Sequence, residues 1–425
     1  MSALLLGCAG VLLQCEERGA APAQRTRPVS PPPVPGSALA PSAPAPPRKP
    51  REPDALSVSE LPADESAAPA PSATNPKPVS KLIIDQAEEL GPAGQMSASE
   101  RGVVMINRRD ELQLAKRGPL GLSTRPERAH FSAIQGGAND FFAVARGPFL
   151  LAQHAYWVRE GKLVRRALDG ATPLQILASD ARNGTRVTGA SLPDAPAHAL
   201  YISNPIADEA PHAKLWVEGA GSVNVSPEGA GASSISAAGT GVDLFTVAID
   251  ARSAMTPMHG RLIHFKAGKP ELEPDVVMWV GSTSQTLSEV FAAATPFGVR
   301  AFLPIERDTS HFGLVMLNLD NEPHMDPKAV WRGYPNGIDV APVASGSLCG
   351  SAFVAYVRPE TASPDARQLL EIAEITSSGL GPAEPVANAL GFANVSLASA
   401  TNFAVLAYVA DFRTFATTLR CTHKR

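Results

Sequence analysis

The stretch YWVREGKLVRRALDGATPLQILA, at residues 156–178, contains the local pattern that decides the fold. An aromatic pair, Tyr156 and Trp157, opens a hairpin that ends in a turn at Asp169 and Gly170. Within it, the run KLVRRALD has the alternation of apolar and polar residues that is typical of a half-exposed strand. The stretch therefore predicts neighbouring antiparallel strands.

The same texture continues from about residue 100 to residue 425, and it repeats. Short runs rich in Val, Ile, Leu, Phe and Tyr are separated by Gly, Pro, Asp and Asn, which is typical of strands and turns. Three classes of run recur every 45–56 residues or so: a small-residue run, a more apolar run and an alternating run. The small-residue runs are FSAIQGGAN, VTGASLP, ISAAGTG, FAAATPFG, VAPVASG and SLASATN, which begin at residues 131, 187, 235, 291, 340 and 396.

A tandem repeat of this length with several strands per unit predicts an all-β fold, a β-propeller. One blade alone cannot bury both of its faces, whereas blades around an axis bury each face against a neighbour. The innermost strands crowd the axis, so we assign the small-residue runs to them. Six units fit residues 120–425, and six blades are preferred. An additional strand pair is predicted at residues 103–116, and it could form a partial seventh blade or close the ring against the C-terminal strands. A pair of β-sandwiches is the alternative fold.

Residues 156–178 also resemble the blades of extracytoplasmic β-propellers, where an aromatic pair opens a hairpin with an Asp-Gly turn. The resemblance covers one blade well and the other units weakly. It implies an architecture only, and no catalytic residue is carried over from it.

The N-terminus resembles the lipobox of bacterial lipoproteins. Leu5, Leu6, Gly7 and Cys8 supply the aliphatic, small and cysteine residues of that motif. The resemblance implies that Cys8 is lipidated and becomes the first residue of the mature chain, with residues 1–19 as a remnant signal and lipobox segment. It also implies a membrane-anchored protein of the bacterial cell envelope, in the periplasm or at the cell surface. A chance cysteine in an ordinary apolar N-terminus is the alternative.

Residues 20–98 are expected to form a disordered linker rich in Pro, Ala and Ser. Seventeen of the forty prolines lie within residues 20–80, and such a composition cannot bury enough apolar area to offset the entropy of the chain. The run KLIIDQAEEL, at residues 81–90, predicts a short helix that GPAG stops. The propeller domain is therefore placed at residues 99–425, and truncation to about residue 98 is expected to leave the thermal midpoint unchanged.

Cys349 and Cys421 lie in the C-terminal quarter, and the spacing of the four cysteines fits no zinc or redox motif. We expect a disulfide between them that fastens the last blade to its neighbour, on the assumption that no peptide chain crosses the joint between the first and last blades. Two buried free thiols are the alternative.

The sequence carries no motif that predicts a catalytic residue, a cofactor or a metal ion. His259 and His264 lie five residues apart on a predicted strand, so they point to opposite faces. The acidic stretch LDNEPHMDPK, at residues 319–328, lacks the turn glycine and distal glutamate of an EF-hand loop. GSLCG, at residues 346–350, has leucine where a nucleophile elbow has serine.

These observations favour a surface-tethered, non-enzymatic binding or scaffold lipoprotein, monomeric, with a protein or glycan partner at one face of the propeller. The net charge of −4 gives no reason to expect nucleic acid as a partner. The alternative is a propeller-based hydrolase or lyase that acts on envelope or extracellular polymers. That enzyme would need two or more carboxylates or histidines at the mouth of the axis, so the side chains there discriminate between the two functions.

Overall fold

The computed structural model describes residues 82–118, 131–136, 140, 146–204, 210–250, 257–279, 290–308, 311–318, 330–335, 341–348, 350–361, 367–400 and 402–421. All of them belong to one unit of the chain, Ala73–Arg425. They contain 28 β-strands and no α-helix. In this part of the chain there is accordingly no helix with the length and apolar character needed to cross a membrane.

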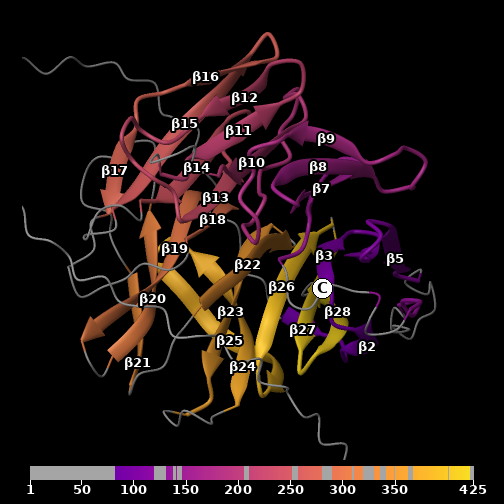
Figure 1. Cartoon of the computed structure of the whole chain (residues 1–425). Coiled ribbons are helices and arrows are strands. Elements are labelled where there is room, and N and C mark those ends of the chain that lie inside the picture. Colours follow the sequence, from indigo (N-terminus) through magenta and orange to yellow (C-terminus); the bar gives the residue numbers. More distant parts are fainter. Residues whose placement is uncertain are drawn as a thin grey trace, which may run out of the picture. The chain divides into compact units, whose positions relative to one another are not determined.

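The described strands form seven antiparallel sheets, which are the blades of a seven-bladed β-propeller (Figure 1). The first three blades consist of β3 (Gln95–Ser99), β4 (Gly102–Ile106) and β5 (Leu112–Lys116); β6 (Phe149–Leu151), β7 (His154–Arg159), β8 (Lys162–Ala167) and β9 (Gln175–Ala178); and β10 (His198–Ile202), β11 (Ala213–Val217) and β12 (Gly221–Asn224). The fourth and fifth consist of β13 (Ser234–Gly239), β14 (Leu244–Ile249), β15 (Met258–Lys266), β16 (Lys269–Leu272) and β17 (Val276–Trp279); and β18 (Phe291–Thr295), β19 (Gly298–Asp308), β20 (His311–Asn318) and β21 (Val330–Pro335). The sixth consists of β22 (Ala341–Leu348), β23 (Ser351–Pro359), β24 (Gln368–Thr376) and β25 (Gly379–Ala389), and the seventh of β26 (Phe392–Ser399), β27 (Phe403–Ala410) and β28 (Arg413–Cys421), together with β1 (Leu82–Ile84) and β2 (Glu88–Pro92).

The prediction of an all-β propeller is confirmed, and the ring contains seven blades rather than the preferred six. The additional blade is the first one. It contains residues 103–116 in β4 and β5, and β3 is its innermost strand. β3 was not predicted from the sequence because four of its five residues, QMSA, lie within the predicted linker.

A separate hydrophobic cluster fills each of the seven joints between neighbouring blades in the described structure. β27 shows how the sequence achieves this. Leu406 and Tyr408 pack toward the sixth blade, while Val405 and Val409 pack toward the first. Successive side chains of a strand point to opposite faces, so a continuous apolar run such as FAVLAYVA contributes to two cores at once.

Short side chains on the innermost strands connect one blade to the backbone of the next. The Ser236 hydroxyl accepts a hydrogen bond from the Ala292 N–H at 2.9 Å, which joins the fourth and fifth blades. The Ser396 hydroxyl accepts one from the Ala98 N–H at 3.0 Å, which joins the seventh and first. Gly147 lies so close to the first blade that a Cβ would overlap a backbone carbonyl there. Small residues are therefore needed near the axis for close approach as well as for side-chain contacts.

Most of the predicted small-residue runs do lie on innermost strands. Those at 235, 291, 340 and 396 overlap β13, β18, β22 and β26. The run at 187 pairs through Thr188 with Leu200 on the inner side of β10. The run at 131 is different, because Phe131 forms a bridge with Arg117, immediately after β5. That run extends the other side of the first blade, and its assignment to an innermost strand was wrong.

The N-terminal strands β1 and β2 close the ring by pairing with β28, while β3 begins the first blade (Figure 1). Arg420 donates to Asp85, with Nε 3.1 Å from Oδ2. Leu90 is 3% exposed and lies in the core between the seventh and first blades. The chain therefore crosses the joint between the first and last blades, contrary to the assumption made from the sequence.

The structure also differs from the sequence prediction at the boundary between linker and domain. Strands at 82–84, 88–92 and 95–99 replace the expected short helix and the last part of the linker. Their apolar residues are satisfied by distant partners on β27 and β28, which a local pattern does not reveal. Residues 1–81 lie outside the described residues, and with them Cys8, the lipobox and most of the predicted linker.

Candidate functional site

The inner edges of all seven blades surround an axial pocket of about 400 Å³. Its described lining includes Ser97 from the first blade, Phe149 from the second, Ser236 from the fourth, Ser345 from the sixth and Ser396 from the seventh. A second cavity of about 420 Å³ shares part of this lining, so the open space continues along the axis. A volume of this size lies in the range of small-ligand sites.

Two arginines, Arg146 and Arg186, are the charged residues among the described lining of the axial pocket. Arg146 precedes β6 of the second blade, and Arg186 lies two residues before Thr188, whose bridge begins the third blade. Arg146 is exposed to the pocket and Arg186 is half-buried. The two neighbouring blades thus direct positive charge into one space.

The surroundings of the two arginines disfavour their charge. Loss of hydration by burial, together with the like charge of Arg146, lowers the pKa of the Arg186 guanidinium to about 10. The Arg146 side chain is exposed, but the protein around the pocket removes part of its hydration and this also lowers its pKa. The Arg186 guanidinium lies over the Phe291 ring, 4.8 Å from its centroid, in a cation–π contact.

Several hydroxyls of the pocket lining already act as joints between blades. Ser236 and Ser396 accept the backbone hydrogen bonds described above, and Ser97 donates to the Pro148 carbonyl. A hydroxyl retains further hydrogen-bonding capacity after one such contact. These side chains can therefore assist a ligand, but their position is explained by the joints alone.

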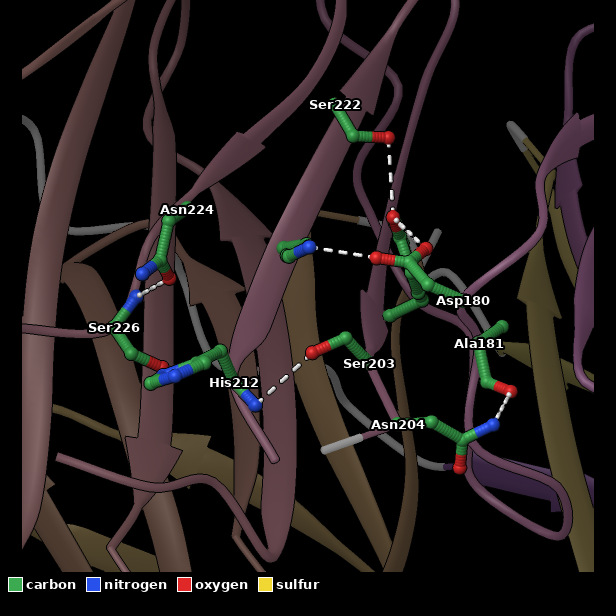
Figure 2. A network of polar contacts seen from close by, with 10 residues as sticks. Asp180, Ala181, Ser203, Asn204, His212, Ser222, Asn224 and Ser226 are labelled. Atoms are coloured by element: carbon green, nitrogen blue, oxygen red, sulfur yellow. Dashed lines mark hydrogen bonds and ion pairs between the residues drawn. The ribbon is translucent and has the colours of Figure 1, made fainter. Parts of the chain in front are cut away.

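A polar network on the second and third blades is an alternative candidate site (Figure 2). The Asp180 carboxylate accepts hydrogen bonds from Tyr201 at 2.9 Å and from Lys214 Nζ at 2.6 Å. Burial alone would raise the pKa of Asp180, but the Lys214 and Tyr201 hydrogen bonds outweigh it and the pKa is lowered. Burial raises the pKa of Tyr201. The Asp180 carboxylate thus has two donors on the third blade, and these contacts fasten the second blade to the third.

The two histidines singled out in the sequence lie on β15 and bind separate carboxylates. His259 Nδ1 is 2.7 Å from Asp275, beside a cavity of about 10 Å³ that could hold one water and no substrate. His264 contacts Asp243 at 2.8 Å and Glu273 at 3.0 Å. The hydrogen bond to Asp243 raises the pKa of His264.

Other residues singled out in the sequence add no site to the described structure. In this part of the chain, no group of three or more His, Cys, Asp or Glu side chains is arranged to hold a metal ion. The acidic stretch at 319–328 lies outside the described residues. Tyr156 and Trp157, from the stretch that predicted the fold, are buried in the joints on either side of the second blade.

Cys421, the last residue of β28, is disulfide-bonded. Cys349 lies outside the described residues, as do Cys8 and Cys15. The pairing of Cys421 with Cys349 therefore stays a prediction.

No protein-family model and no curated protein matches the chain. Solved structures with similar folds include the N-terminal domain of Nup159, with a TM-score of 0.45 at 7% identity over 80% of this chain and 95% of that one. A fucose-specific lectin from Aleuria aurantia has a TM-score of 0.36 at 10% identity, over 63% of this chain and 89% of the lectin. Likenesses this distant carry no argument about a ligand.

Sequence analysis did not identify Arg146 and Arg186. The local signal was weak: Arg146 stands before the apolar run of ARGPFLL, and Arg186 stands before the small-residue run of TRVTGAS. Arginine before a strand is common on protein surfaces, so only the arrangement of the blades shows that both enter the same pocket.

Proposed function

We propose that this chain is a surface-tethered, non-enzymatic binding or scaffold lipoprotein of a bacterial envelope, anchored to the membrane through Cys8. The observation that supports binding is the axial pocket. Its described lining contains small and hydroxyl side chains and two arginines, and it contains neither a carboxylate nor a histidine. The hydrolase or lyase alternative needs a pair of such groups at this position for general acid–base chemistry.

The place where the chain enters the propeller supports the tether. β1 pairs with β28 on the side away from β26, so it is an outermost strand of the seventh blade. A linker that precedes Leu82 would join the disc at its rim. An anchored propeller would then keep its axial pocket open to a partner, as a binding or scaffold protein requires.

The anchoring proposal is tested by expressing the full chain from its native locus, including any upstream start, and fractionating the cells. We expect the protein in the membrane fraction, with an acylated Cys8 as the first residue of the mature chain by mass spectrometry. A Cys8→Ser variant should leave that fraction, and a Cys15→Ser variant should remain in it. A mature chain with an unmodified Cys8 would refute the anchor.

The binding proposal is tested with the same full chain. Envelope glycans and solubilised envelope proteins are offered to the immobilised wild type and to a variant that carries Arg186→Gln. Retention of a defined partner by the folded wild type supports the proposal. Turnover of an envelope polymer by the purified chain would instead establish the hydrolase or lyase alternative.

A further inference from the structure

We propose that Arg146 and Arg186 together bind the oxyanion of a small ligand, a phosphate, sulfate or carboxylate group, in the axial pocket. The inference rests on the proposed binding function and gives that function a ligand class. It is carried by the position of the two guanidiniums on adjacent blades, facing one pocket that the described lining leaves without a negative charge.

The charge of Arg186 is the first step of the argument. Among the described residues, the charge that perturbs this guanidinium belongs to Arg146, which repels it. A partly buried cation is costly unless an opposite charge compensates it. An anion in the pocket would supply that charge to Arg186, so binding would relieve an existing electrostatic cost there.

The chemistry of the guanidinium is the second step. Its planar fork of N–H donors fits two oxygens of a carboxylate, phosphate or sulfate at once. The Arg186 guanidinium packs over the Phe291 ring, and this contact restricts its movement. Arg146 approaches from the neighbouring blade, so a group with several oxygens can accept hydrogen bonds from both arginines.

The size and lining of the pocket are the third step. A space of about 400 Å³ exceeds the need of a single inorganic anion. The rest of its lining combines hydroxyl and amide side chains such as Thr188 and Asn394 with apolar ones such as Phe149 and Leu397. The remainder of the ligand is therefore expected to be small and to present both polar and apolar groups.

The test is a calorimetric titration of the full chain with inorganic phosphate, sulfate or acetate at constant ionic strength, with chloride as the reference anion. We expect the wild type to bind at least one of the three with a dissociation constant of about 1 mM or below, a moderate affinity. Preference for phosphate or sulfate would indicate a tetrahedral dianion, and preference for acetate a carboxylate. Arg186→Gln and Arg146→Gln should each weaken binding at least about tenfold, a loss of one charge-assisted contact.

Two further variants distinguish recognition by the guanidinium groups of the pocket from a nonspecific effect of positive charge on the protein. Arg186→Lys keeps the charge but loses the fork, and we expect intermediate affinity. Arg367→Gln removes an exposed arginine that bonds to Asn388 on the sixth blade, outside the described pocket lining, and should bind like the wild type. Circular dichroism and the thermal midpoint without added anion check that each variant folds.

The ligand-class proposal is overturned if the wild type binds none of the three anions more tightly than chloride. It is equally overturned if both glutamine variants bind like the wild type. These outcomes would leave the anchoring result and the retention of an envelope partner untouched, so the failure of the anion site can be distinguished from failure of the proposed function.

Discussion

Leu90→Ala tests whether β2 belongs to the folded domain or to the linker. The Leu90 side chain is 3% exposed and packs in the core between the seventh and first blades, with Met96 and Val405 among its cluster. Its carbonyl accepts a hydrogen bond from the Ile134 N–H at 3.0 Å, which the substitution leaves in place. The variant therefore removes apolar contacts and little else.

The expected loss is about 3 kcal/mol in the free energy of unfolding. This lies within the range of about 2–5 kcal/mol for replacing a buried leucine with alanine, which leaves a cavity in the core. The upper part of that range is not expected, because one wall of this core is the short β2, which can relax toward the cavity. Such a loss is a large fraction of the stability of an ordinary domain, about 5–15 kcal/mol.

The assay is urea unfolding of the full chain, followed by tryptophan fluorescence and circular dichroism together. Leu390→Ala is the matched control, because Leu390 is 70% exposed between β25 and β26; its effect should stay within about 0.5 kcal/mol. If Leu90→Ala costs no more than Leu390→Ala, β2 does not contribute to the core. The first expectation, that truncation to about residue 98 is harmless, would then stand.

Three further predictions concern other parts of the ring. Because the pKa of His264 is raised in the folded protein, its stabilising contribution is fully present below about pH 6.5, the unfolded value, and is lost as the pH rises through the higher folded pKa. The thermal midpoint should therefore fall more between pH 6 and pH 8.5 in the wild type than in His264→Gln. An equal fall of the midpoint in the two proteins would contradict this. Gly147→Ala should cost at least about 2 kcal/mol in urea unfolding, because the new Cβ would overlap the Met96 carbonyl, whereas Gly268→Ala, in an open turn, should cost about 1 kcal/mol through backbone strain alone. Thiol titration of the denatured, unreduced chain should find neither Cys349 nor Cys421 reactive, and peptide mapping that joins Cys421 to another cysteine would rule out the predicted pair.

The local pattern predicted the strands and the propeller because those properties repeat within 45–56 residues or so. Alternation identified KLVRRALD as a strand, and β8 (Lys162–Ala167) occupies that stretch. The small-residue runs identified the innermost strands wherever close approach between blades required Ser, Ala or Gly, as at Ser236 and Ser396.

Features that depend on distant pairing could not be predicted in this way. The residues LII and EELGP form strands because β28 offers them an edge more than 300 residues later in the sequence. In isolation the same residues carry acidic and apolar positions that suit a helical turn equally well. The convergence of Arg146 and Arg186 depends in the same way on the ring, since nothing near either arginine indicates the other.

The closure of the ring also determines when folding of the domain can be completed during synthesis. The ribosome makes β1 and β2 first and β28 last, and the hydrogen bond from the Thr417 hydroxyl to the Asp85 carbonyl joins residues 332 positions apart. Until β28 has emerged, the first strands have no partner and the core around Leu90 lacks one wall. Contacts between residues so far apart in the sequence form late and slowly. Until they form, the unpaired strand edges can promote aggregation. Loss of only the final strand, at the end of translation or by proteolysis, would therefore release both ends of the chain at once.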